Sequence, residues 1–202
     1  MRLNILTAEE LGALHRTELV RAFPPDELKP LKSMLSLLEQ QRYQALGLVD
    51  EQGLHGYALF WLEPDIPFAL LDYFGTLEGQ RGTGLGSQML ELLSDFYKDS
   101  RGIFVEAEGI VSPDPAEARL QARRLDFYAR NGFRYGGYDC ALFGVHYRTL
   151  IRGDASVTPE ELLEAHQRIY RSGIPPRAYE RFIQLPLREG EQVRPATDWI
   201  EE

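Results

Sequence analysis

One stretch decides the fold: Gln80-Arg81-Gly82-Thr83-Gly84-Leu85-Gly86-Ser87. Before it, residues 68–77 form an apolar run that predicts a buried strand, and from Gly84 onward apolar residues recur at helical spacing. Glycines let backbone N–H groups approach an anion closely, and the N-terminus of a helix adds a favourable dipole. A strand, a glycine turn and a helix start in this order predict a site for a pyrophosphate.

The spacing of the loop separates three kinds of nucleotide-binding motif. A P-loop requires a lysine before its terminal hydroxyl residue, and this loop contains no lysine. A dinucleotide motif, G-x-G-x-x-G, has Ser87 or Met89 where its last glycine belongs. The pattern R-x-x-G-x-G remains, and Arg81, Gly84 and Gly86 match it. A tight turn without a ligand is the alternative that the loop alone leaves open.

A second motif follows downstream, Asp126-Phe127-Tyr128-Ala129-Arg130-Asn131-Gly132-Phe133. It is similar to the F-Y-x-x-x-G-F segment that ends the last core helix of the GCN5-related N-acetyltransferases (GNAT), and R-x-x-G-x-G is the loop motif of the same family. The chain therefore resembles this family over roughly residues 1–150. The resemblance implies an α/β (α+β) fold with a mixed, mostly antiparallel central sheet flanked by helices.

The sequence pattern agrees with that order of elements. Alternation and apolar runs predict strands over residues 2–6, 43–49, 57–62, 68–77, 103–110, 133–135 and 142–150. Helical spacing and caps predict helices over residues 8–23, 26–38, 84–96, 116–131, 158–171 and 177–183. We expect a GNAT-like domain over residues 1–152. We also expect a helical C-terminal extension over 153–202 that packs on the same domain, with Trp199 and Ile200 as the anchors of its polar last stretch.

The family resemblance implies acetyl-CoA as co-substrate. Backbone groups of Phe74, Gly75 and Thr76 then lie near the thioester and the pantetheine arm. The expected pyrophosphate and cofactor contacts come from Arg81, Gly82, Thr83, Gly84, Leu85, Gly86, Ser87 and Asn131. Tyr128 matches the tyrosine that donates a proton to the departing thiolate, although a tyrosine in a Phe-Tyr pair is often simply part of a core.

An amine acceptor arrives protonated and needs a base. Glu106 and Glu108 alternate with apolar neighbours on a predicted strand, so both are expected to point to one face. Charged residues are rarely buried unpaired, which makes both carboxylates candidate general bases. The alternative is that they form ion pairs with Arg123 or Arg124 near the end of the strand.

Composition limits the remaining possibilities. The net charge of −9 disfavours nucleic acid and anionic membranes as partners, and a single cysteine excludes an intramolecular disulfide. No ligand spacing predicts a metal, and no secretory or membrane-spanning signal is evident, so we expect a cytoplasmic location. His15, His55 and His166 are expected to be surface or structural residues.

The function expected from these motifs is N-acetyl transfer. The acetyl group of acetyl-CoA would pass to a primary amine, either a small molecule or a peptide, by direct attack in a ternary complex, since no activated nucleophile is visible. A homodimer is possible. A non-catalytic module that binds or senses acyl-CoA is the alternative, because it needs the loop but neither Tyr128 nor Glu106.

Overall fold

A computed structural model describes residues 1–25 and 27–196 of the chain. The chain forms two compact units, Met1–Ser100 and Arg101–Glu202. Both are built from antiparallel strands and flanking helices, so the predicted fold class is confirmed. The boundary expected between residues 152 and 153 stays a prediction. Within the described residues, every helix is too short or too polar to cross a membrane.

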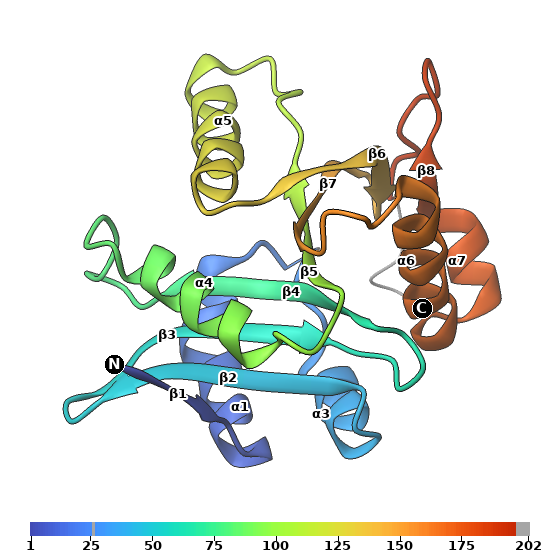
Figure 1. The fold of residues 1–202 in the computed structure, drawn as a ribbon. Coiled ribbons are helices and arrows are strands. Elements are labelled where there is room, and N and C mark those ends of the chain that lie inside the picture. The colour runs from blue at the N-terminus through green and yellow to red at the C-terminus, as the bar shows by residue number, and fades with distance from the viewer. Residues whose placement is uncertain (26, 197–202) are drawn as a thin grey trace. The chain divides into compact units, whose positions relative to one another are not determined.

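The first unit is built on an antiparallel sheet (Figure 1). Its strands lie in the order β1 (Arg2–Ile5), β2 (Tyr43–Asp50), β3 (Gly53–Trp61) and β4 (Phe68–Thr76). Leu59, Phe60 and Trp61 are almost fully buried although neighbouring side chains point to opposite faces. Both faces of β3 are therefore covered, which explains the continuous apolar runs in this part of the sequence.

The helices of the first unit lie on both faces of this sheet. Figure 1 shows α4 (Leu85–Phe96) on one face, with α1 (Ala8–Leu14) and α3 (Leu31–Glu39) on the other. The π-helical segment η1 (His15–Leu19) and the short α2 (Val20–Ala22) continue the chain after α1.

The first predicted helix begins as expected, but the second does not. A capping box between Thr7 and Glu10 starts α1. The helix expected from residue 26 starts only at Leu31, and residue 26 lies outside the described residues. The physical reason is Pro30, because a residue that precedes proline avoids the helical conformation. Residues 27–30 therefore form a connection rather than a first helical turn.

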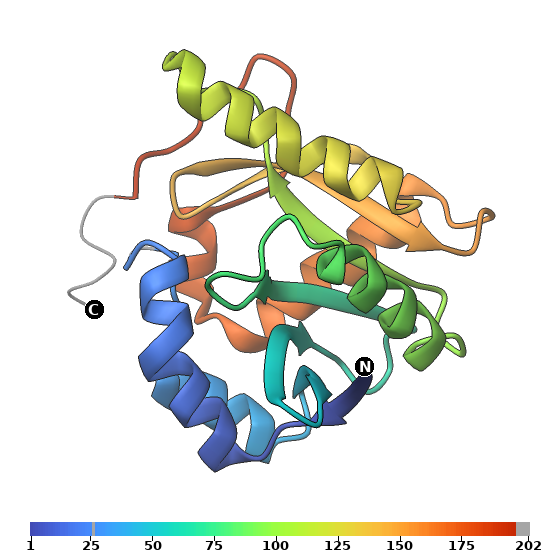
Figure 2. The same ribbon diagram turned by 90° about the vertical axis from the view of Figure 1, so that its left-hand side faces the viewer.

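The strands of the second unit pair antiparallel in the order β5 (Gly102–Glu108), β7 (Val145–Gly153), β6 (Arg134–Leu142) and β8 (Ile183–Leu187). Figures 1 and 2 place α5 (Pro115–Arg130) on one face of these strands. The same views place α6 (Pro159–Gly173) and α7 (Pro176–Phe182) on the other face.

Two strands of the second unit differ from the expectation. The short strand expected over 133–135 extends to Leu142. The sequence did not indicate this because the register shifts after Tyr135, at Gly136 and Gly137, and the shift interrupts the alternation of apolar and polar residues. No strand was predicted after residue 150, yet Ile183–Leu187 form β8, which begins at the last residue of the helix predicted over 177–183. Pro186 argues against a strand in the sequence, because proline cannot donate a backbone hydrogen bond. It is tolerated here because β8 pairs with β6 at the edge of the sheet. The expected anchors Trp199 and Ile200 lie outside the described residues.

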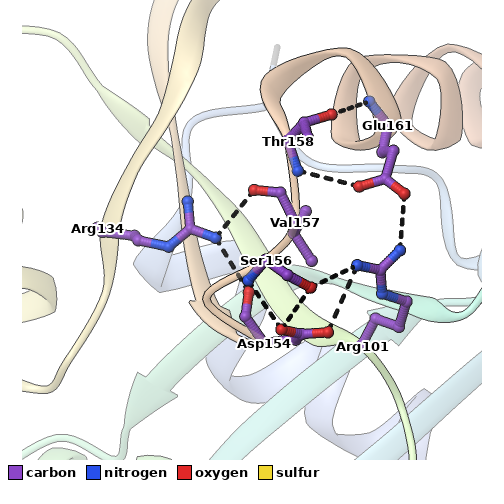
Figure 3. A network of polar contacts seen from close by, with 7 residues as sticks. All are labelled: Arg101, Arg134, Asp154, Ser156, Val157, Thr158 and Glu161. Atoms are coloured by element: carbon purple, nitrogen blue, oxygen red, sulfur yellow. Dashed lines mark hydrogen bonds and ion pairs between the residues drawn. The ribbon is translucent and has the colours of Figure 1, made fainter.

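A polar network ties the start of α6 to the sheet of the second unit (Figure 3). Arg101 contacts the carboxylates of Glu161 at 2.8 Å and Asp154 at 3.4 Å. Thr158 is the N-cap of α6 and forms a reciprocal capping box with Glu161. Arg134 donates to the backbone carbonyls of Asp154 and Val157. This part of the C-terminal segment is therefore integrated into the second unit.

Candidate functional site

The loop between β4 and α4 has the geometry of an anion cradle. Gly82 and Gly84 adopt φ angles of 78° and 86°, and a Cβ placed on either would meet no atom within 4 Å. Open space therefore lies beside both glycines. The Thr83 hydroxyl donates to the Gln80 carbonyl at 2.6 Å and closes the turn.

The end of the loop is also the start of a helix. Gly84 is the N-cap of α4, and the first backbone bond of the helix runs from the Gln88 N–H to the Gly84 carbonyl. The N–H groups of the first turn consequently have no partner within the helix and are available to an anion. These features fit the pyrophosphate of acetyl-CoA, and the first-turn residues Leu85, Gly86 and Ser87 would hold it.

The C-terminal end of β4 carries the expected thioester-binding residues. Phe74, Gly75 and Thr76 are half-buried and pair with β3, where Gly75 lies opposite Tyr57. A Cβ on Gly75 would lie 2.6 Å from the Tyr57 hydroxyl oxygen, so glycine leaves room for this phenol. Burial, followed by the charge of Glu18, raises the pKa of Tyr57 to about 12, against the opposing charge of Arg81.

Tyr57 is a further candidate for the site, and the sequence analysis did not name it. Its hydroxyl lies beside Gly75, and the Arg81 charge acts on it, so it stands where the strand end and the loop meet. No motif singles it out, because its position depends on cross-strand pairing.

A bulge in β4 lies at Asp72. The register passes from Tyr73 to Leu71 against consecutive residues of β3, which leaves Asp72 unpaired across the sheet. Its buried carboxylate accepts from Lys29 Nζ at 2.6 Å and from the Tyr43 hydroxyl at 2.5 Å. The Lys29 ammonium also lies 5.0 Å from the centre of the Trp61 ring. This cluster fixes the connection before α3 onto the sheet.

Tyr128 lies in the last turns of α5, as its motif predicts. Its ring contacts Phe127 and Phe133 edge to face, with centroids 5.4 and 5.2 Å apart. Burial raises the pKa of Tyr128, against the opposing charge of Arg124, so the phenol keeps its proton at neutral pH. A phenol that stays protonated is able to act as an acid.

The two candidate bases were expected to point to one face, but their side chains contact different helices, which lie on opposite faces of these strands. Glu106 accepts hydrogen bonds from residues of α6, whereas Glu108 pairs with Arg124 of α5 at 2.6 Å. Glu108 also accepts from Gln121, whose own carbonyl oxygen receives the backbone N–H groups of residues 111 and 112. Glu108 thus forms the ion pair with Arg124 that was the alternative to a catalytic role, and the assignment of Glu106 or Glu108 as the base stays a prediction.

Asn131 is the C-cap of α5, and its buried side-chain amide donates to the Phe127 carbonyl at 2.7 Å. Its expected contact with the cofactor stays a prediction.

Of the expected site residues, those on β4 and its loop belong to the first unit. Glu106, Glu108, Tyr128 and Asn131 belong to the second. Among the residues that the structure describes, no group of three or more His, Cys, Asp or Glu is arranged to hold a metal ion.

Comparison with known proteins rests on structure. No protein-family model matches the chain, and no curated protein matches it. A solved structure described as a putative GNAT-family acetyltransferase from Bacteroides thetaiotaomicron is similar, with a TM-score of 0.69 and 22% identity. That match covers 87% of this chain and 100% of the other.

Two further solved structures have similar folds. A mutant form of the spermidine/spermine N-acetyltransferase SpeG from Vibrio cholerae matches with a TM-score of 0.55 and 11% identity, over 76% of this chain and 94% of the other. The ribosomal-protein-S18-alanine N-acetyltransferase from Escherichia coli matches with a TM-score of 0.52 and 18% identity, over 77% and 94%. The chain thus has the fold of GNAT acetyltransferases.

Proposed function

We propose that this protein is an N-acetyltransferase that moves the acetyl group of acetyl-CoA to a primary amine. The observation that carries the proposal is the loop between β4 and α4. Its motif, its two glycines with positive φ and the open space beside them all suit a pyrophosphate at a helix N-terminus. The fold shared with known N-acetyltransferases adds support.

In this proposal the amine attacks the thioester directly in a ternary complex. Acetyl-CoA supplies an activated acetyl group when it is bound. The acceptor ammonium first loses a proton to a base, for which Glu106 is the candidate. Its nitrogen then bonds to the carbonyl carbon, and the C–S bond breaks. Tyr128 gives its proton to the leaving thiolate. The nitrogen loses a second proton as the amide forms, and this proton replaces the one that Tyr128 has given up.

The acceptor class proposed is a cationic amine. The net charge of −9 favours a positively charged partner over an anionic one. The similar folds include enzymes whose names specify a polyamine and a protein alanine as acceptors, so both a small amine and a peptide N-terminus are reasonable candidates. A solved structure of the Vibrio cholerae enzyme is dodecameric, which makes self-association of this chain worth measuring. A cytoplasmic location also remains a proposal.

The test begins with acetyl-CoA binding by calorimetry and continues with a turnover screen over polyamines, alkylamines and short peptides. The Tyr128→Phe variant keeps the ring contacts and removes the acid. We expect it to bind acetyl-CoA like the wild type and to lose about 100-fold or more in kcat. Tyr135→Phe, which removes an exposed phenol of the same unit, is the matched control.

The outcomes separate the two function classes. Binding without turnover of any amine would support the non-catalytic acyl-CoA-binding module. Absence of acetyl-CoA binding by the wild type would refute both functions and leave the loop as a turn.

A further inference from the structure

The Tyr57 ring is buried, but its hydroxyl has no partner. The residue keeps 2% of its surface exposed, and its hydroxyl forms no hydrogen bond with any of residues 1–25 and 27–196. A buried tyrosine usually finds a partner for this group. The hydroxyl lies at the end of β4, where a Cβ on Gly75 would come within 2.6 Å of it. A free hydrogen-bonding group thus lies beside the residues that are expected to face the thioester.

Tyr57 points to the face of the first sheet that carries α1 and α3. Its neighbour Gly56 faces the other way, because a Cβ on Gly56 would lie 3.4 Å from the Met89 sulfur of α4. Successive residues of a strand point to opposite faces, so Tyr57 faces away from α4. Figure 1 shows α1 and α3 on that side of the sheet. The segment that continues α1 therefore begins on the same face as the Tyr57 hydroxyl.

Two contacts place this segment along β3 and β4. The Phe23 ring, at the end of α2, contacts the Tyr73 ring edge to face, with centroids 4.9 Å apart. Five residues earlier in the chain is Glu18, whose charge, after burial, raises the pKa of Tyr57. Five helical residues rise about 7 Å, and the two strand positions from Tyr73 to Gly75 span about the same distance. Glu18 therefore lies over the pair that Tyr57 and Gly75 form across the strands.

The π-helical segment η1 sets the direction of the Glu18 side chain. The Val20 N–H bonds to the carbonyl of His15, five residues back. The buried residues Leu14 and Leu19 are also five positions apart, whereas three or four positions separate neighbours on one face of an α-helix. The extra residue carries Leu19 into the core and leaves Glu18 half-buried beside it. Such π-helical insertions are frequent at functional sites.

The Glu18 carboxylate has no hydrogen bond or ion pair with any residue that the structure describes. A half-buried carboxylate is only partly hydrated, so a cation beside it would stabilise it. Arg81 is exposed and acts on Tyr57 with the opposite sign. A pyrophosphate held by the loop would compensate Arg81, and Glu18 then remains as the charge that attracts a cation. All of these residues belong to the first unit.

We infer that Glu18 and the Tyr57 hydroxyl bind the ammonium group of the acceptor, and that this pair selects alkylamines. The inference rests on the proposed function. The Glu18 carboxylate forms an ion pair with the protonated amine, and the Tyr57 oxygen accepts one of its N–H bonds beside Gly75. An arylamine, which is uncharged at neutral pH, offers no charge to Glu18 and is therefore disfavoured.

A first experiment measures binding without turnover. Calorimetry with spermidine and with butylamine, in the presence of saturating CoA, compares the wild type with Glu18→Gln. We expect the variant to bind both amines about 30-fold more weakly, because it loses a partly screened ion pair. Glu9→Gln removes the same charge from an exposed position of α1 and is the matched control, which should bind like the wild type. Equal affinities of Glu18→Gln and the wild type would overturn the inference.

A second experiment separates KM from kcat in the acetylation of the best alkylamine from the screen. The ion pair forms before the amine loses its proton, so Glu18→Gln should raise the KM of the amine about 30-fold without lowering kcat or acetyl-CoA affinity. Salt should raise the KM of the wild type but have little effect on that of Glu18→Gln. Tyr57→Phe removes one hydrogen bond and should raise KM about fivefold.

The stability of the variants and the wild-type activity complete the test. Neither group has a partner within the described residues, so Glu18→Gln and Tyr57→Phe should unfold at the temperature of the wild type. Lower unfolding temperatures of both variants would assign these groups a structural role and overturn the inference. The same salt dependence of KM in Glu18→Gln and the wild type would refute it while the proposed function stands. Absence of turnover of every amine by the wild type would instead refute the proposed function.

Discussion

A substitution at Gly84 tests whether the loop between β4 and α4 binds a ligand or is a simple turn. Its φ of 86° places it in the left-handed region, and a Cβ there would meet no atom within 4 Å. A side chain at this position therefore costs backbone strain of about 1–2 kcal/mol but no steric clash. The protein should still fold when Gly84 is replaced by Asp, and the new carboxylate stands in the space where a pyrophosphate would approach.

The expected loss of binding follows from charge. Two unit charges 4 Å apart near a protein surface repel by about 4 kcal/mol. The loop is exposed and salt screens it, so half of that value, about 2 kcal/mol, is a conservative figure. Since 1.4 kcal/mol corresponds to a factor of ten, acetyl-CoA should bind Gly84→Asp about 30-fold more weakly.

Calorimetry with acetyl-CoA measures this loss, and two variants isolate its cause. Gly84→Asn has nearly the same shape without the charge and tolerates the left-handed region, so it should bind more tightly than Gly84→Asp. Gly190→Asp places the same side chain in open space at a φ of 77° in the second unit, and it reports the backbone cost alone through thermal unfolding. Equal affinity of Gly84→Asp and wild type, in a folded protein, would refute the assignment of the loop to the pyrophosphate.

Three further predictions concern stability and pH. Lys29→Met should destabilise the first unit by about 3 kcal/mol, because it leaves the buried Asp72 carboxylate without its cation; urea unfolding measures the change, and a loss below about 1 kcal/mol would contradict it. Burial raises the pKa of Tyr128, so ionisation of this residue should not lower kcat below pH 10. A fall in kcat near pH 8 that is absent in Tyr128→Phe would contradict this prediction. Hydrogen bonds from the Thr158 backbone and then from Arg101 lower the pKa of Glu161, so its contribution is present above about pH 4.5 and is lost as the pH falls. Glu161→Gln should thus destabilise the chain more at pH 7 than at pH 3, and equal losses at both values in thermal unfolding would show that the carboxylate charge is irrelevant.

Interactions between near neighbours in the chain could be predicted from the sequence. The capping boxes of α1 and α6 join residues three positions apart, and the turn before α4 needs glycine at positions set by local backbone geometry. The motif around Tyr128 likewise placed this residue in the last turns of a helix. Most strands were found for the same reason, because burial on one or both faces leaves its own periodicity.

The sequence was a poorer guide where a distant partner sets the structure. The sequence did not predict β8, because Pro186 argues against a strand; β8 forms because it pairs with β6. Glu106 was expected to act as a base or to pair with Arg123 or Arg124, yet its partner is His166, which lies 60 residues away in the chain. Asp72 points to Lys29 only because a bulge in β4 redirects it. Backbone geometry and hydrogen bonds over three or four residues are encoded locally, whereas the partner of a buried charge depends on which elements pack together, and only the tertiary structure decides that.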